Sequence, residues 1–88
     1  MTITELRKQI DEVDHAIIDL IIRRFEYVKD IGALKKIERK DPLDTDRFRQ
    51  VLIDRVAYAR ERGVDKKIIE TIWHEIHNHA LEIEKSDE

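Results

Sequence analysis

The chain has 88 residues, of which 41% are hydrophobic and 42% are charged, with two Gly, one Pro and no Cys. This composition favours a helical protein with charged outer faces over a sheet protein or a disordered chain, and the lack of Cys excludes disulfides and thiolate metal sites. The net charge of −3 argues against nucleic-acid binding as a bulk property.

The first predicted element is a long helix from about Ile3 to about Arg39, with Thr2 and Glu5 spaced as a capping box at its start. Steps of three and four residues mark one stripe, which is apolar or aromatic except at Arg24: Ile3, Leu6, Ile10, Val13, Ile17, Leu20, Arg24, Tyr27, Ile31 and Leu34. Such a helix is roughly 50 Å long, whereas a compact globule of this size has a radius of gyration of about 12 Å. The remaining residues cannot cover it, so we expect an intertwined homodimer.

Arg24 and Lys35 are the candidate ligand-binding residues of this helix. A buried guanidinium is costly unless an anion meets it. Lys35 follows eleven residues later, almost a whole number of turns, so both cations share a face with Val28 and Ile31. This face predicts a closed pocket for a small anion. Gly32 marks either a close approach of another backbone or ligand, or simply a tolerated Gly.

Pro42 interrupts the helical pattern. A second helix is expected from about Thr45 to Arg62, and a third, begun by Asp65, from about Lys66 to Glu84. Candidate N-caps for the second helix are Asp44, Thr45 and Asp46. The predicted fold class is therefore all-α, with one long and two shorter helices in a single domain, residues 1–88.

Arg7 and Arg47 are further candidate cations. Arg7 lies seventeen residues before Arg24, which turns it away from the Arg24 face. One helix cannot aim both at one ligand, but a dimer can, if Arg7 reaches into the partner's pocket. Taken alone, Arg7 and Arg47 are more readily explained by surface ion pairs with Asp and Glu; Arg24 is not.

The third helix carries two further polar features. His74 and His77 lie three residues apart, a possible pair of metal ligands, but partly exposed helix residues are the favoured interpretation and we expect no metal. Glu84 follows Ile76 and Ala80 by steps of four, so it either joins the apolar face beside a cation or sits at a frayed end in solvent.

No nucleophile and base stand in a recognisable motif, and there is no Gly-rich phosphate loop. An enzyme of this sequence needs no covalent catalysis and no cofactor; a pericyclic reaction fits, because the protein need only hold its substrate and stabilise developing charge. No apolar run spans a membrane and the N-terminal sequence lacks the form of a signal peptide, so we expect a cytoplasmic protein that makes no membrane contact.

The sequence resembles the all-helical class of chorismate mutases, near the branch containing isochorismate pyruvate lyase. The similarity runs from about Leu6 to Glu84. It is carried by LRKQIDEVDHAIIDLIIRR, by RRFEYVKDIGALK, by DTDRFRQVL, and by GVD followed by IIETIWHEIHNHALEIE. The segment YVK, from Tyr27 to Lys29, resembles the lyase branch in particular.

The resemblance implies an intertwined homodimer with two pockets for a small dicarboxylate. Arg24 would bind a carboxylate of the substrate within its own chain, and Arg7 would come from the partner to bind the other. Lys35 would hydrogen-bond the ether oxygen whose bond breaks, and Glu84 stands where many members carry a Gln that donates to the same oxygen. Asp44 and Arg47 would lie at the lid and the edge of the pocket.

Two departures from the family pattern bear on the substrate. Phe48 stands where the typical mutase has a Glu that contacts the ring hydroxyl, and the stretch around Pro42 is slightly shorter. Chorismate mutase is the first interpretation. The alternatives are isochorismate pyruvate lyase, a mutase of 4-amino-4-deoxychorismate, and a non-catalytic helical dimer. Because a carboxylate cannot donate a hydrogen bond, we also expect activity to require protonated Glu84.

Overall fold

The computed structural model describes residues 1–86 and contains three helices, α1 (Ile3–Ile37), α2 (Thr45–Glu61) and α3 (Lys66–Lys85). No strand occurs among these residues. The all-α prediction with one long and two shorter helices is confirmed, and every helix end lies within two residues of its predicted position. The last two residues of the predicted domain lie outside the described part of the chain.

Each helix begins at an N-cap whose side-chain oxygen accepts a backbone N–H. Thr2 caps α1, Asp44 caps α2 and Asp65 caps α3. Asp44 accepts the N–H of Arg47 at 2.9 Å, so among the three candidates it is Asp44 that starts α2.

The long helix α1 ends in a Schellman turn. The N–H of Lys40 donates to the carbonyl of Lys35 at 2.8 Å, and the N–H of Arg39 donates to the carbonyl of Lys36 at 3.2 Å. Arg39 has a φ of 56°, the left-handed conformation that Gly usually occupies at this position. The turn therefore ends the helix before Arg39 and directs the chain toward Pro42.

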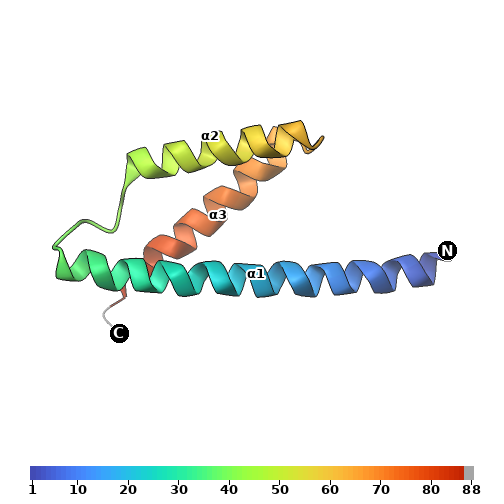
Figure 1. Ribbon diagram of the computed structural model, residues 1–88, viewed down its shortest axis with the longest axis horizontal. Helices are drawn as coiled ribbons and strands as arrows, with labels where there is room; N and C mark the ends of the chain where they lie inside the picture. Colours follow the sequence, from blue (N-terminus) through green and yellow to red (C-terminus); the bar gives the residue numbers. More distant parts are fainter. Residues whose placement is uncertain (87–88) are drawn as a thin grey trace.

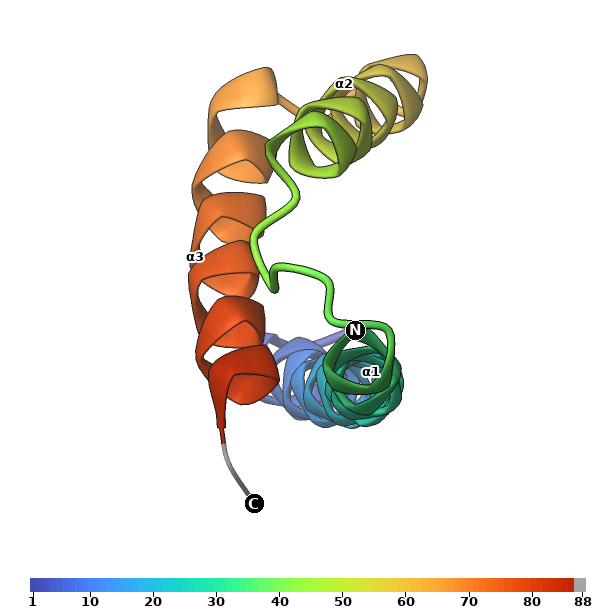
Figure 2. The same ribbon diagram turned by 90° about the vertical axis from the view of Figure 1, so that its left-hand side faces the viewer.

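Helix α3 crosses from α2 to α1 and packs against both (Figure 1), and Figure 2 shows that it stands to one side of them. Within the described residues, α1 and α2 do not pack directly against each other. The N-terminal half of α1 extends well beyond α3 (Figure 1). The radius of gyration is 16.2 Å, against about 12 Å for a compact chain of this length, so much of α1 has no cover from its own chain.

The core is correspondingly small. Its buried hydrophobic residues in the described chain are Val28, Val51, Ala59 and Ala80. The apolar stripe of α1 is largely exposed, with Tyr27 at 64% and Leu34 at 55%. A stripe of this length on a single helix is the surface that a partner subunit would cover.

Candidate active site

A pocket of about 350 Å³ is formed by side chains from all three helices and the α1–α2 loop. Six of the seven predicted site residues line it: Arg24, Lys35, Asp44, Arg47, Phe48 and Glu84. Further lining residues that were not predicted as site residues include Pro42, Trp73 and His77. Arg7 is exposed in the N-terminal half of α1 and does not line the pocket of its own chain.

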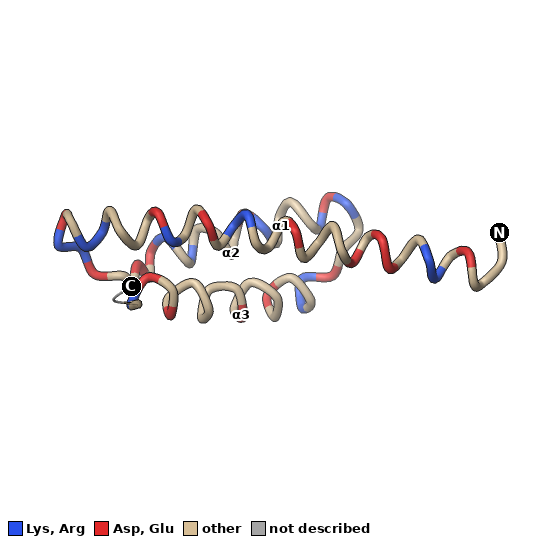
Figure 3. The backbone as a smooth tube through the Cα atoms, turned by 90° about the horizontal axis from the view of Figure 1, so that it is seen from below, with Lys and Arg blue, Asp and Glu red and all other residues tan. Residues whose placement is uncertain are grey.

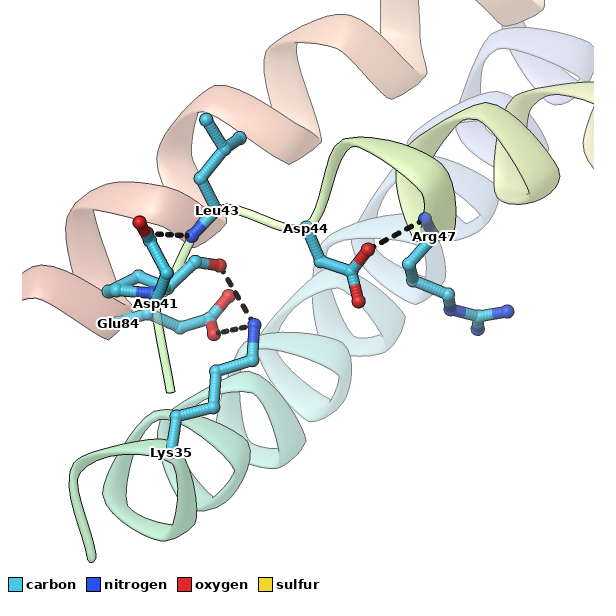
Figure 4. Close-up of polar contacts among 7 residues, drawn as sticks. Lys35, Asp41, Leu43, Asp44, Arg47 and Glu84 are labelled. Atoms are coloured by element: carbon cyan, nitrogen blue, oxygen red, sulfur yellow. Dashed lines mark hydrogen bonds and ion pairs between the residues drawn. The ribbon is translucent and has the colours of Figure 1, made fainter. Parts of the chain in front are cut away.

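Lys35 is the centre of the polar contacts in this pocket (Figure 4). Its Nζ lies 2.7 Å from Oε1 of Glu84 and donates to the carbonyl oxygen of Pro42 at 2.8 Å. An ammonium group has three protons to donate. Two are directed to these partners, which leaves the third for a ligand. The contact with Pro42 also ties the α1–α2 loop to the site.

Glu84 reaches Lys35 because α1 and α3 approach closely at Gly32. A Cβ added to Gly32 would lie 3.0 Å from the Cα of Glu84 and 3.4 Å from its Cβ. Of the two interpretations of Gly32, the close approach of another backbone is therefore correct. Glu84 is only 9% exposed, so it joins the apolar face beside a cation and is not a solvent-exposed end.

Arg24 and Arg47 supply positive charge without an acidic partner among residues 1–86. Burial lowers the pKa of Arg24, and the nearby charges of Arg55 and Arg47 lower it further. This direction means that the surroundings disfavour the charged guanidinium. A bound anion would offset that penalty, so the charges at this end of the pocket suit a carboxylate.

Along α1 the charges are unevenly distributed, as Figure 3 shows. Residues 3–20 carry five acidic and two basic side chains, whereas residues 21–37 carry two acidic and five basic side chains. Arg24 and Lys35, the two cations of α1 that line the pocket, therefore lie in the basic half of the helix.

Phe48 is held by two histidines of α3. Its ring stacks on His77, with centroids 3.8 Å apart and planes at 15°, and meets His74 edge-on at 5.1 Å. Burial and then the proximity of His74 lower the pKa of His77; Glu84 acts in the opposite direction, and Arg24 and Lys35 add to the lowering. The imidazole of His77 is thus favoured in its neutral form.

The sequence carries a signal for His77 as a pocket residue. His77 lies three residues before Ala80 and seven before Glu84, which places it on the same face of α3. Its spacing from His74 alone indicates only a possible pair of metal ligands. Within the described residues, no group of three or more His, Asp or Glu side chains is arranged to hold a metal ion.

None of the described helices combines the length and the apolar character needed to cross a membrane.

The chain matches the family model of chorismate mutase type II over residues 6–85. The chain is 31% identical to the chorismate mutase of Methanocaldococcus jannaschii over 83 residues, covering 91% of this chain and 83% of that protein. It is 30% identical to the isochorismate pyruvate lyase of Pseudomonas aeruginosa over 74 residues, or 84% of this chain and 72% of the lyase.

A third relative is the T-protein of Enterobacter agglomerans, 34% identical over 70 residues. That match covers 80% of this chain but only 19% of the relative, so the chain spans about a fifth of the T-protein. No solved structure matches the chain significantly.

Proposed function

Because the chain belongs to the chorismate mutase type II family, we propose that its single domain, residues 1–88, rearranges chorismate to prephenate. The reaction is a pericyclic Claisen rearrangement, in which one carbon–oxygen bond breaks and one carbon–carbon bond forms, with no covalent intermediate. It needs no cofactor. The observation that carries this proposal is the cationic pocket, where Arg24 and Arg47 lack acidic partners within residues 1–86 and Lys35 has a proton to spare.

The proposed roles follow from the charges of the substrate. Arg24 binds a carboxylate, and Arg47 lies at the edge of the pocket, where it adds to the positive field. The free proton of Lys35 hydrogen-bonds the ether oxygen, which gains negative charge as its bond breaks. Glu84 orients Lys35 through their 2.7 Å contact; its carboxyl could donate to the same oxygen only in the protonated form. Asp44 holds the start of α2, and therefore Arg47 and Phe48, in position through its cap.

We further propose that the active form is a homodimer in which Arg7 enters the pocket of the partner. The exposed apolar stripe of α1 supports a second copy as its cover. Antiparallel pairing of two α1 helices would set the acidic half of each against the basic half of the other. If that pairing is centred midway between residues 7 and 24, Arg7 lies opposite Arg24 of the partner subunit.

Isochorismate pyruvate lyase activity is the second candidate. The observation that favours it is Phe48, whose apolar ring offers no hydrogen bond to a ring hydroxyl, together with the 30% identity to a lyase. Both reactions are pericyclic and need the same carboxylate contacts. A mutase of 4-amino-4-deoxychorismate is a third candidate on the same ground, the missing polar contact at Phe48.

The test is to incubate the purified protein separately with chorismate, isochorismate and 4-amino-4-deoxychorismate and to identify the products. Prephenate from chorismate is the expected result. Salicylate and pyruvate from isochorismate would assign the lyase reaction instead. If none of the three compounds is bound or consumed, the chain is a non-catalytic helical dimer and the proposal is wrong.

A further inference from the structure

We propose that His77 determines specificity in this pocket by hydrogen-bonding the ring substituent of the substrate through its imidazole nitrogens. The inference rests on the proposed function and adds to it a recognition residue on α3.

The position of His77 suits this role. It lines the pocket together with Arg24 and Lys35, and its parallel stack on Phe48, at 3.8 Å, fixes the plane of its ring. With one face of the ring covered, its polar atoms lie on the edge. Among residues 1–86, neither ring nitrogen makes a hydrogen bond within the chain, so both remain available to a ligand.

The inventory of polar groups in the pocket leads to the same residue. The charged side chains match the carboxylates and the ether oxygen, whereas Phe48 offers no hydrogen bond at all. Uncharged polar side chains that line the pocket are His77 and Trp73. The indole of Trp73 is a donor only, but a neutral imidazole both donates and accepts, as a hydroxyl does. A hydroxyl enclosed without a partner costs binding energy, so His77 is the group that can satisfy it.

The surroundings of His77 favour a neutral ring, which can accept a hydrogen bond. The titratable groups around His77 are Arg24 and Lys35 of α1, Asp44 of the α1–α2 loop, Arg47 of α2, and His74 and Glu84 of α3. Burial and all of the cations named for its pKa favour the neutral ring, and only Glu84 opposes them. A neutral ring retains the lone pair that accepts a hydrogen bond from a hydroxyl or an ammonium substituent.

The experiment measures ligand binding by calorimetry, independently of turnover. Two oxabicyclic dicarboxylates that mimic the cyclic transition state are compared, one with a ring hydroxyl and one without it. The wild-type protein is expected to bind the hydroxylated ligand about tenfold more tightly. His77→Phe should remove this preference while leaving the Kd of the deoxy ligand unchanged, which also shows that the pocket is folded. His77→Gln, which retains hydrogen bonding, should preserve most of the preference.

His79→Gln is the matched control, because His79 lies on the same helix, contacts Phe25 and is absent from the pocket; it should bind both ligands as the wild type does. Equal affinities of the wild type for the two ligands, or the same preference in His77→Phe, would overturn the inference. Loss of turnover on all substrates with the binding preference intact would instead reject the proposed function alone.

Discussion

Gly32 on α1 and Glu84 on α3 approach so closely that a Cβ on Gly32 would lie 3.0 Å from the Cα of Glu84. Lys35 lies three residues after Gly32, nearly one turn further along the same helix. The contact that docks α3 against α1 is thus also the contact that sets the Glu84 carboxylate 2.7 Å from the Lys35 ammonium. Packing and the proposed chemistry depend on the same pair of helices at the same point.

Replacing Gly32 with Ala tests this dependence. Ala raises helix propensity by about 1 kcal/mol, but here the added methyl group meets backbone. We expect Gly32→Ala to lower both the free energy of unfolding and kcat, because α3 must shift and move Glu84 away from Lys35. The control is Gly63→Ala, which adds strain at a φ of 80° without any nearby atom; it should lose about 1 kcal/mol of stability and keep kcat. Equal kcat in both variants would contradict the argument.

Lys35→Ala removes the proposed donor to the ether oxygen. We expect kcat to fall by about 100-fold or more, with the helical circular dichroism spectrum retained. Lys36→Ala is the matched control, since Lys36 is the adjacent lysine and its Nζ contacts the carbonyl of Ser86 outside the pocket. Full activity of Lys35→Ala would remove Lys35 from the mechanism.

Glu84 is expected to make turnover depend on pH. A Glu84 carboxylate, 2.7 Å from the Lys35 ammonium, accepts hydrogen bonds but does not donate them. If the reaction needs Glu84 as a donor, activity should decline as pH rises, whereas Glu84→Gln, always a donor, should show a flatter profile of kcat against pH. Profiles of the same shape for the two proteins would show that protonation of Glu84 plays no part.

Mixed dimers test whether Arg7 crosses between subunits. Arg7→Ala and Arg24→Ala should each be inactive alone. Mixing equal amounts under conditions that allow subunit exchange should restore about a quarter of the sites, because half of the dimers are mixed and each has one intact pocket. No recovery after exchange, confirmed by native mass spectrometry, would place Arg7 outside the site.

We expect His77 to make the free energy of unfolding depend on pH. Its pKa lies below the ordinary value of 6.5 in the folded chain, so the unfolded chain binds more protons between these two values. The contribution of His77 to the free energy of unfolding is therefore complete above about pH 6.5, and it is lost as the pH falls toward the folded-state pKa. Urea unfolding at several pH values should show a steeper loss of stability in the wild type than in His77→Gln. Parallel curves would contradict this account.

The sequence by itself determined the three helices and the shared face of Arg24 and Lys35. Both follow from local rules, because N-caps, Pro42 and the 3.6-residue period act within a few residues along the chain. One local feature was not predicted, the turn that ends α1. Arg39 adopts the left-handed conformation there, and because it is not Gly the sequence carries no signal for the turn.

Only the tertiary structure decided which side chains from different helices meet. The ion pair of Lys35 with Glu84 and the stack of Phe48 on His77 join positions far apart in the sequence. Helix periodicity shows which residues share a face, but it does not show which face of α3 meets α1. That choice came from the close approach at Gly32, where one absent side chain lets two backbones come together and completes the pocket.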